Sequence, residues 1–127
     1  MKKFVIDTDV LIDATRGFVD SLAFFEKYED EISVSVITFS EIYSGFKNDK
    51  EEKRVMAFCN LFERIEVNEE IAILAGRFRK KYGKSHGSGI IDCIIAATAH
   101  YEDATLVTLN KKHFPMLTNI LVPYKKS

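Results

Sequence analysis

The residues of this sequence best placed to do chemistry are three acids, Asp7, Glu41 and Asp92. Asp7 ends the apolar run FVI, Glu41 follows the β-branched run ISVSVI by four residues, and Asp92 lies inside the apolar stretch GIIDCIIAATA. A carboxylate without a partner in an apolar setting costs several kcal/mol or stays protonated. Asp92 in particular needs a partner, and no Lys or Arg lies within one helical turn of it.

Each acid taken alone also has a structural explanation. Asp7 suits the N-cap of a following helix. Thr38 and Glu41 match the spacing of a capping box, in which the glutamate closes back on the cap residue. Asp92 would be the third residue of a helix capped by Gly89, where the helix dipole favours an acid.

Taken together, the three acids favour a metal site. In a parallel sheet the functional crevice lies beyond the carboxyl ends of the strands, where all three acids fall. Carboxylates gathered there repel one another, and a hard cation with oxygen ligands relieves that repulsion. Since Mg²⁺ is held by one or two carboxylates and leaves room for phosphate, the pattern predicts a Mg²⁺ or Mn²⁺ site for phosphate chemistry.

Short strands that alternate with helices must position these acids. The patterns predict strands at 3–7, 32–37, 63–67, 105–109 and 120–122. They predict helices at 9–15, 18–28, 38–46, 50–62, 69–82 and 90–101, a loop at 85–89 and one helical turn at 110–114. Nearly continuous apolar strands separated by helices indicate an α/β fold, a single-domain α/β/α sandwich around a parallel sheet that spans residues 1–127.

The charge balance limits how this chain can hold nucleic acid. It carries 18 basic and 19 acidic residues, so it lacks the basic excess of a protein that binds mainly through phosphates. One eight-residue stretch does concentrate positive charge: Arg77, Arg79, Lys80, Lys81 and Lys84. These five residues are candidates for RNA binding, with a solvated helix face as the alternative.

Other side chains have simpler explanations. Cys59 and Cys93 lie in apolar runs without a CxxC partner, which predicts reduced core thiols in a cytoplasmic protein. The N-terminal lysines precede an apolar run too short for a signal peptide or a membrane span. The histidines at 86, 100 and 113 have no carboxylate positioned to tune them and are poor candidates for a catalytic base. The aromatic residues near the N-terminal helices, including Phe25 and Tyr43, are expected mainly in the core, with some at a partner surface.

Four segments together resemble the PIN-domain family, and the VapC toxins in particular. They are FVIDTDVLID, SVITFSEIYSGF, GIIDCIIAATAHY and LVTLNKKHF, which occur in that order from Phe4 to Phe114. The resemblance implies a parallel sheet in an α/β/α sandwich, Mg²⁺- or Mn²⁺-dependent cleavage of RNA, a homodimer and an antitoxin protein that covers the active site. It matches Asp7, Glu41 and Asp92 to the family's three acids.

The chain departs from that family at its fourth site position. The family often has an Asp where this chain has Asn110, which can donate a carbonyl oxygen but adds no charge, so Asn110 is the weakest of the four metal ligands. Thr108 resembles the family's hydroxyl residue. Asp9 stands where relatives often have Asn or Ser, and it either joins the site or caps the helix.

Two enzymatic alternatives and one binding alternative remain. FVIDTDVLI also fits the first motif of haloacid-dehalogenase-type phosphatases, with Asp7 as nucleophile and Asp9 as acid/base, although the later acids of that family are missing. A response-regulator receiver domain has the right length, but its phospho-acceptor aspartate is missing after the third strand. A catalytically weak RNA-binding module of the same fold is supported only by Asn110.

The favoured mechanism is in-line attack by a metal-activated water on an RNA phosphodiester.

Overall fold

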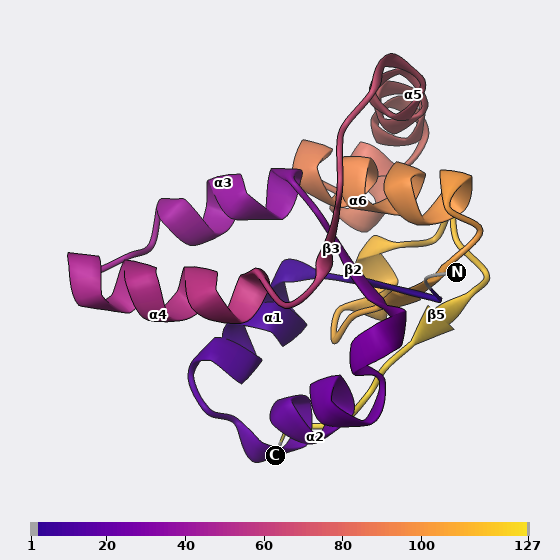
Figure 1. The fold of residues 1–127 in the computed structure, drawn as a ribbon. Helices are drawn as coiled ribbons and strands as arrows, with labels where there is room; N and C mark the ends of the chain where they lie inside the picture. The colour runs from indigo at the N-terminus through magenta and orange to yellow at the C-terminus, as the bar shows by residue number, and fades with distance from the viewer. Residues whose placement is uncertain (1–2, 127) are drawn as a thin grey trace.

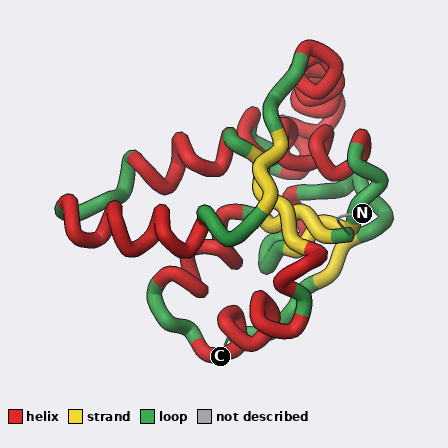
Figure 2. Tube along the Cα trace, in the orientation of Figure 1, coloured by secondary structure: helices red, strands yellow, loops and turns green. Residues whose placement is uncertain are grey.

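A five-stranded, all-parallel sheet forms the centre of the computed structural model, which describes residues 3–126. Met1, Ser127 and Lys2, one of the N-terminal lysines, lie outside the described residues. The strands are β1 (Phe4–Ile6), β2 (Ile32–Ser35), β3 (Glu63–Ile65), β4 (Thr105–Val107) and β5 (Ile120–Leu121). Their order across the sheet is β3-β2-β1-β4-β5, which places β1 in the middle. Figure 2 shows the strands in yellow, with helices around them.

Helices connect the strands and surround the sheet (Figure 1). They are α1 (Thr8–Thr15), α2 (Val19–Lys27), α3 (Ile37–Tyr43), α4 (Asp49–Cys59), α5 (Glu69–His86) and α6 (Ile90–Tyr101), with short 3₁₀ turns η1 (Glu29–Glu31) and η2 (Lys111–His113). Every pairing in the sheet is parallel, so each connection must cross over, and helices make most of these crossovers.

Two hydrophobic layers cover the two faces of the sheet. In β1, Phe4 and Ile6 belong to one buried cluster, with residues from α1, α2 and α4, whereas Val5 belongs to the other, with residues from α6. This alternation is the period-2 pattern of a strand buried on both faces. Helix α5 then packs on the outer side of α6 through Ile71 and Ala75. The predicted α/β/α sandwich is confirmed.

Most predicted elements are confirmed, but several of their boundaries were wrong: α3 and α4 end earlier than predicted, as do β3 and β4, and the ends of α5 and β2 also differ. Asn68 caps α5 as expected, its side chain accepting from the Ile71 N–H at 2.9 Å. The helix runs on to His86 and ends at Gly87, whose φ of 66° suits glycine, so the predicted loop is shorter. The second strand stops at Ser35, because the chain turns at Val36 and α3 already begins at Ile37.

The C-terminal segment returns to α1. Asp13 is a buried acid of that helix, and it accepts hydrogen bonds from Tyr124 Oη at 2.7 Å and from Lys126 Nζ at 2.6 Å.

The two cysteines are free and buried, as expected. Among residues 3–126, no helix combines the length and the apolar character that crossing a membrane requires.

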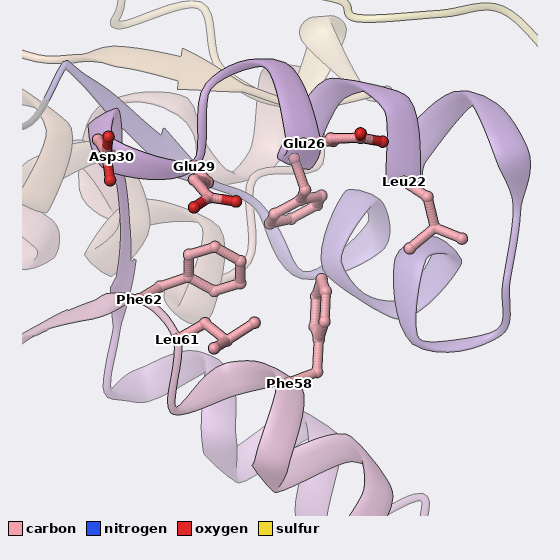
Figure 3. Close-up of a pocket in the computed structure, with 8 residues that line it drawn as sticks. Leu22, Glu26, Glu29, Asp30, Phe58, Leu61 and Phe62 are labelled. Carbon is pink, nitrogen blue, oxygen red and sulfur yellow. The ribbon is translucent and has the colours of Figure 1, made fainter.

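An apolar hollow of about 410 Å³ opens between α2 and the C-terminal end of α4 (Figure 3). Phe25, Phe58 and Phe62 form its walls with ring centroids 5.2–5.3 Å apart. Glu26 and Glu29 lie on its rim. The hollow therefore combines an aromatic interior with an acidic edge.

The buried layers predict where truncation destabilises the chain. Leu106 is completely buried in β4, whereas Leu61 is 72% exposed. We expect Leu106→Ala to lower the free energy of unfolding by about 2–5 kcal/mol, because it leaves a cavity between β4 and α6. Leu61→Ala should change it by less than about 0.5 kcal/mol. Urea denaturation measures both, and equal losses in the two variants would contradict this packing.

Candidate functional site

Asp7 lies at the carboxyl end of β1 and is also the N-cap of α1. The parallel register pairs Ile6 with Val107, which places Asp7 beside Thr108. Asp7 Oδ1 accepts from the Thr8 N–H at 2.8 Å, and Asp7 Oδ2 accepts from Thr108 Oγ1 at 2.7 Å. The expected capping role is therefore real, and each oxygen retains a lone pair for a further ligand.

Burial makes this carboxylate hard to ionise. Asp7 is 7% exposed, and desolvation, followed by repulsion from Asp9, raises its pKa to about 7. The hydrogen bonds from Thr108 and the Thr8 N–H lower the pKa, and the charge of Asp92 raises it. A cation at this position would relieve both the burial cost and the repulsion.

Asp9 joins the first helix to the loop after β4. Its carboxylate accepts from the Val10 N–H at 2.7 Å and from the Leu109 N–H at 3.1 Å. Desolvation raises its pKa, with further contributions from Asp13 and Asp92. Asp13 itself is already paired with Lys126, so Asp9 is the acid of α1 that remains part of the cluster.

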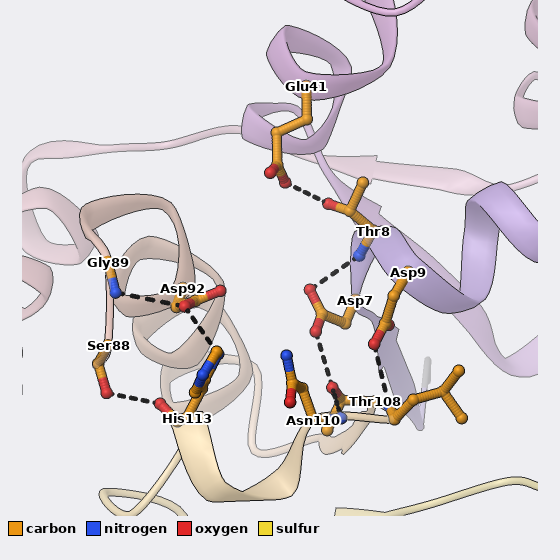
Figure 4. Close-up of polar contacts among 11 residues, drawn as sticks. Asp7, Thr8, Asp9, Glu41, Ser88, Gly89, Asp92, Thr108, Asn110 and His113 are labelled. Carbon is orange, nitrogen blue, oxygen red and sulfur yellow. Dashed lines mark hydrogen bonds and ion pairs between the residues drawn. The ribbon is translucent and has the colours of Figure 1, made fainter. Parts of the chain in front are cut away.

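Glu41 reaches the same region from α3. The predicted capping box with Thr38 is wrong, because α3 begins at Ile37 and Thr38 is completely buried inside the helix. Instead, Glu41 Oε1 accepts from Thr8 Oγ1 at 2.6 Å (Figure 4). Glu41 is thus tied to the residue that follows Asp7, and its carboxylate is directed toward the end of β1.

Asp92 is the third residue of α6 and is less buried than its sequence surroundings indicate. Its side chain is 27% exposed, and Asp92 Oδ2 accepts from the Gly89 N–H at 3.3 Å. The capping alternative is therefore present too. The electrostatic effect of Asp92 on both Asp7 and Asp9 places it in the same cluster.

The sequence reasoning missed His113. Its Nδ1 lies 3.6 Å from Asp92 Oδ2, so the expectation that no carboxylate approaches the histidines was wrong. Ser88 Oγ also donates to the His113 carbonyl at 2.7 Å, which ties η2 to the loop before α6. The separation of 21 residues hides this pair from local patterns. One signal was available in the sequence. His113 lies three residues after Asn110, in the segment that follows the strand predicted to end beside Asp7.

Thr108 and Asn110 complete the edge of the site after β4. The Thr108 hydroxyl donates to Asp7 and accepts from the Asn110 N–H at 2.9 Å, so its proton and one of its two lone pairs are used. Asn110 is exposed, and its side chain points into the space between Asp7 and His113 (Figure 4). Its side-chain amide is therefore available to a ligand.

The predicted RNA-binding residues lie outside this cluster. They are all positions of α5: Arg77, Arg79, Lys80, Lys81 and Lys84. Of the other two histidines, His86 contacts Ser85 at 2.7 Å and His100 meets Tyr101 edge-to-face, so neither takes part in the acid cluster.

The donor set fits a small hard cation. Carboxylate and amide oxygens with room for water are what Mg²⁺ and Mn²⁺ bind in proteins. Across residues 3–126, no three acid, histidine or cysteine side chains already enclose a position for a metal. Mg²⁺ usually needs only one or two carboxylates and otherwise keeps its water, so the open arrangement is compatible with it.

Comparison with known proteins identifies the family. The family model "PIN domain" matches residues 4–116, which is most of the chain. The chain therefore belongs to the PIN-domain family, and the resemblance seen in the sequence is confirmed. This assignment removes the phosphatase and receiver-domain alternatives.

Its relatives narrow the comparison further. The chain is 35% identical to "Ribonuclease VapC19" from Mycobacterium tuberculosis, covering 94% of this chain and 98% of that protein. It is 34% identical to "Ribonuclease VapC1" from Methanocaldococcus jannaschii, covering 91% and 81%. A solved "toxin-antitoxin complex" from Klebsiella pneumoniae contains a chain that is 27% identical with a TM-score of 0.84, covering 98% of this chain and all of that one.

The raised pKa of Asp7 predicts how stability depends on pH. The folded chain holds this proton up to about pH 7, whereas the unfolded chain releases it near 3.8. The group therefore stabilises the fold fully below about pH 4, and this contribution is lost as the pH rises to about 7. Asp7→Asn removes the charge and keeps both contacts, since its amide can donate to Thr108. We expect this variant to raise the free energy of unfolding of metal-free protein at pH 8 by about 1–3 kcal/mol.

The control is Asp103→Asn, which changes the same group at an exposed position. Urea denaturation at pH 5 and pH 8 in EDTA measures the difference, which should shrink at the lower pH. An Asp7→Asn variant less stable than wild type at pH 8 would show that the ionised carboxylate stabilises the metal-free fold.

Proposed function

We propose that this chain is a divalent-metal-dependent endoribonuclease that acts as the toxin of a toxin–antitoxin pair. The observation that carries this proposal is the meeting of Asp7, Glu41 and Asp92 at the carboxyl edge of a PIN-domain sheet. Relatives named as VapC ribonucleases, at 35% identity over nearly the whole chain, support the same activity. The metal is Mg²⁺ or Mn²⁺.

The proposed roles follow from the contacts. Asp7, Glu41 and Asp92 hold the cation directly or through water, with Asn110 as a neutral fourth donor. The cation, when bound, acidifies a water and neutralises charge on the scissile phosphate. Thr108 keeps Asp7 oriented, and Asp9 fixes the loop that carries Asn110 through the Leu109 N–H. His113 holds Asp92 in place.

The partner surfaces are part of the proposal. Solved relatives include a "DNA bound VapBC" from Salmonella typhimurium, whose matching chain is 26% identical with a TM-score of 0.77. We infer a cognate antitoxin for this chain, and also the homodimer that the family resemblance implies. The aromatic hollow of Figure 3, with Glu26 and Glu29 on its rim, suits an apolar segment flanked by basic residues.

The free, buried cysteines support a cytoplasmic location.

The basic residues of α5 are proposed to attract RNA over a longer range. Arg77, Arg79, Lys80, Lys81 and Lys84 lie on a helix that ends at His86, close in sequence to Asp92. Their contribution should be nonspecific and should weaken with salt.

The decisive experiment is an RNA cleavage assay. Purified protein, freed of any co-purifying antitoxin, is incubated with transfer RNA and structured RNAs in Mg²⁺ or Mn²⁺. We expect cleavage that disappears in EDTA and falls at least about 100-fold in Asp92→Asn, which removes a charged ligand. Asp103→Asn, prepared identically, should cut like wild type.

Two results would count against this function. Equal cutting by wild type and Asp92→Asn would identify a contaminating nuclease and remove Asp92 from the site. RNA binding without cleavage in any metal would favour the binding-module alternative, and Asn110→Asp would then test whether the missing charge is the cause.

The His113 contact predicts an effect on metal affinity. Removing a partner that orients a metal ligand typically weakens binding 10–100-fold. We expect His113→Ala to weaken Mn²⁺ binding by that factor in isothermal titration calorimetry. His113→Asn, which can place a donor near the Nδ1 position, should restore much of it. Unchanged Mn²⁺ affinity in His113→Ala would mean that His113 only links η2 to the preceding loop.

A further inference from the structure

The acid cluster creates an electrostatic problem for an RNA-cutting site. Asp7, Asp9, Glu41 and Asp92 gather at one sheet edge, and the chain as a whole has a net charge of −1. A bound cation offsets part of this charge at the scissile phosphate. The neighbouring phosphates of an RNA strand still approach an acidic surface, so productive binding requires cations beside the site.

A groove that opens beside Glu41 contains such cations. It lies between α1, α3 and α4, has a volume of about 240 Å³, and includes Glu41 in its lining. Arg16, Lys47 and Arg54 line it from the end of α1, the loop after α3 and helix α4. Glu41 lines the groove and also accepts from Thr8 beside Asp7, so the groove adjoins the acid cluster.

Among the described residues, none of the three cations forms an ion pair. Arg54 Nη1 donates to the Thr15 carbonyl at the end of α1, which fixes one edge of the guanidinium and leaves its other N–H groups available. Within residues 3–126, neither Arg16 nor Lys47 forms a salt bridge. Glu51 also lines the groove, but it lies in the first turn of α4, where the helix dipole already favours an acid.

We propose that this groove is a phosphate subsite for single-stranded RNA, in which Arg16, Lys47 and Arg54 bind a phosphate of the strand other than the scissile one. The inference rests on the proposed nuclease function and adds to it the path of the substrate. Asp7 and Arg16 lie at opposite ends of α1, roughly 13 Å apart along the helix axis, so the subsite holds a phosphate other than the one at the metal.

The remaining lining favours a single strand over a duplex. Phe46 lines the groove and is only partly buried, so it offers a ring against which an unstacked base can lie. The volume is smaller than the roughly 300 Å³ at which small-molecule pockets begin. The groove therefore suits a short part of a flexible polymer.

The test compares substrates with and without the extra phosphate. The variant is Arg16→Gln/Lys47→Gln, because neither side chain makes a hydrogen bond or ion pair in the described structure. The matched control is Lys50→Gln/Lys53→Gln, which removes two exposed charges from α4 outside the groove. Each protein is assayed on a single-stranded oligonucleotide and on a dinucleoside monophosphate, which contains only the scissile phosphate.

We expect the groove variant to raise KM for the oligonucleotide about tenfold with little change in kcat, and to behave like wild type on the dinucleotide. The slope of log affinity against log salt, measured by fluorescence anisotropy in EDTA, should fall by roughly 0.7 for each phosphate that the variant no longer neutralises. The control variant should match wild type in both assays.

The outcomes separate this inference from the proposed function. Wild type that cleaves neither substrate in any metal would refute the nuclease, and anisotropy alone would then decide the subsite: a reduced salt slope supports it, and an unchanged one overturns it. Wild type that cleaves both substrates, with a groove variant that matches the control throughout, would overturn the subsite and leave the nuclease intact. In that case the groove serves a protein partner or none.

Discussion

The buried carboxylate of Asp7 is the constraint on which the rest of the site depends. A strand buried on both faces ends at this residue, so its charge is almost fully removed from water. Two donors, the Thr8 N–H and the Thr108 hydroxyl, offset only part of the cost, and the pKa remains raised. The surrounding elements then bring more acids toward this position. Such an arrangement destabilises the metal-free protein and is explained by a ligand that needs negative charge at this point.

The sheet order explains why the polar groups meet here. From β1 the chain moves through β2 to β3 on one side, and then returns to β4 and β5 on the other. The chain therefore leaves the carboxyl ends of β1 and β4 toward opposite sides of the sheet. Open α/β sheets bind ligands at such a point. Asp7, Asp9, Thr108 and Asn110 all come from the connections after β1 and β4. Glu41, after β2, and Asp92, at the start of α6, approach from the two sides.

The sequence predicted the parts of this arrangement that depend on local patterns. Apolar strands, the cap at Asn68 and the position of Asp7 at a strand end all follow from short-range physics, and the structure agrees with them. The errors involve contacts between distant segments. Glu41 had a local capping partner in sequence, but α3 begins one residue before Thr38, and the glutamate pairs with Thr8 instead. His113 reaches Asp92 only because η2 folds back against the start of α6.

The departure from the family pattern at Asn110 has a counterpart at position 9. In that pattern an acid often occupies the position of Asn110, and position 9 is often Asn or Ser. This chain has the reverse, with Asp9 and Asn110, and the two positions are physically adjacent because Asp9 accepts from the Leu109 N–H at 3.1 Å. Asp9 thus places a negative charge on the β1 side of the β1–β4 pair, next to the residue that precedes the neutral Asn110. Because the field at a cation depends on the number of nearby carboxylates more than on which strand carries them, Asn110 alone is weak support for an inactive site.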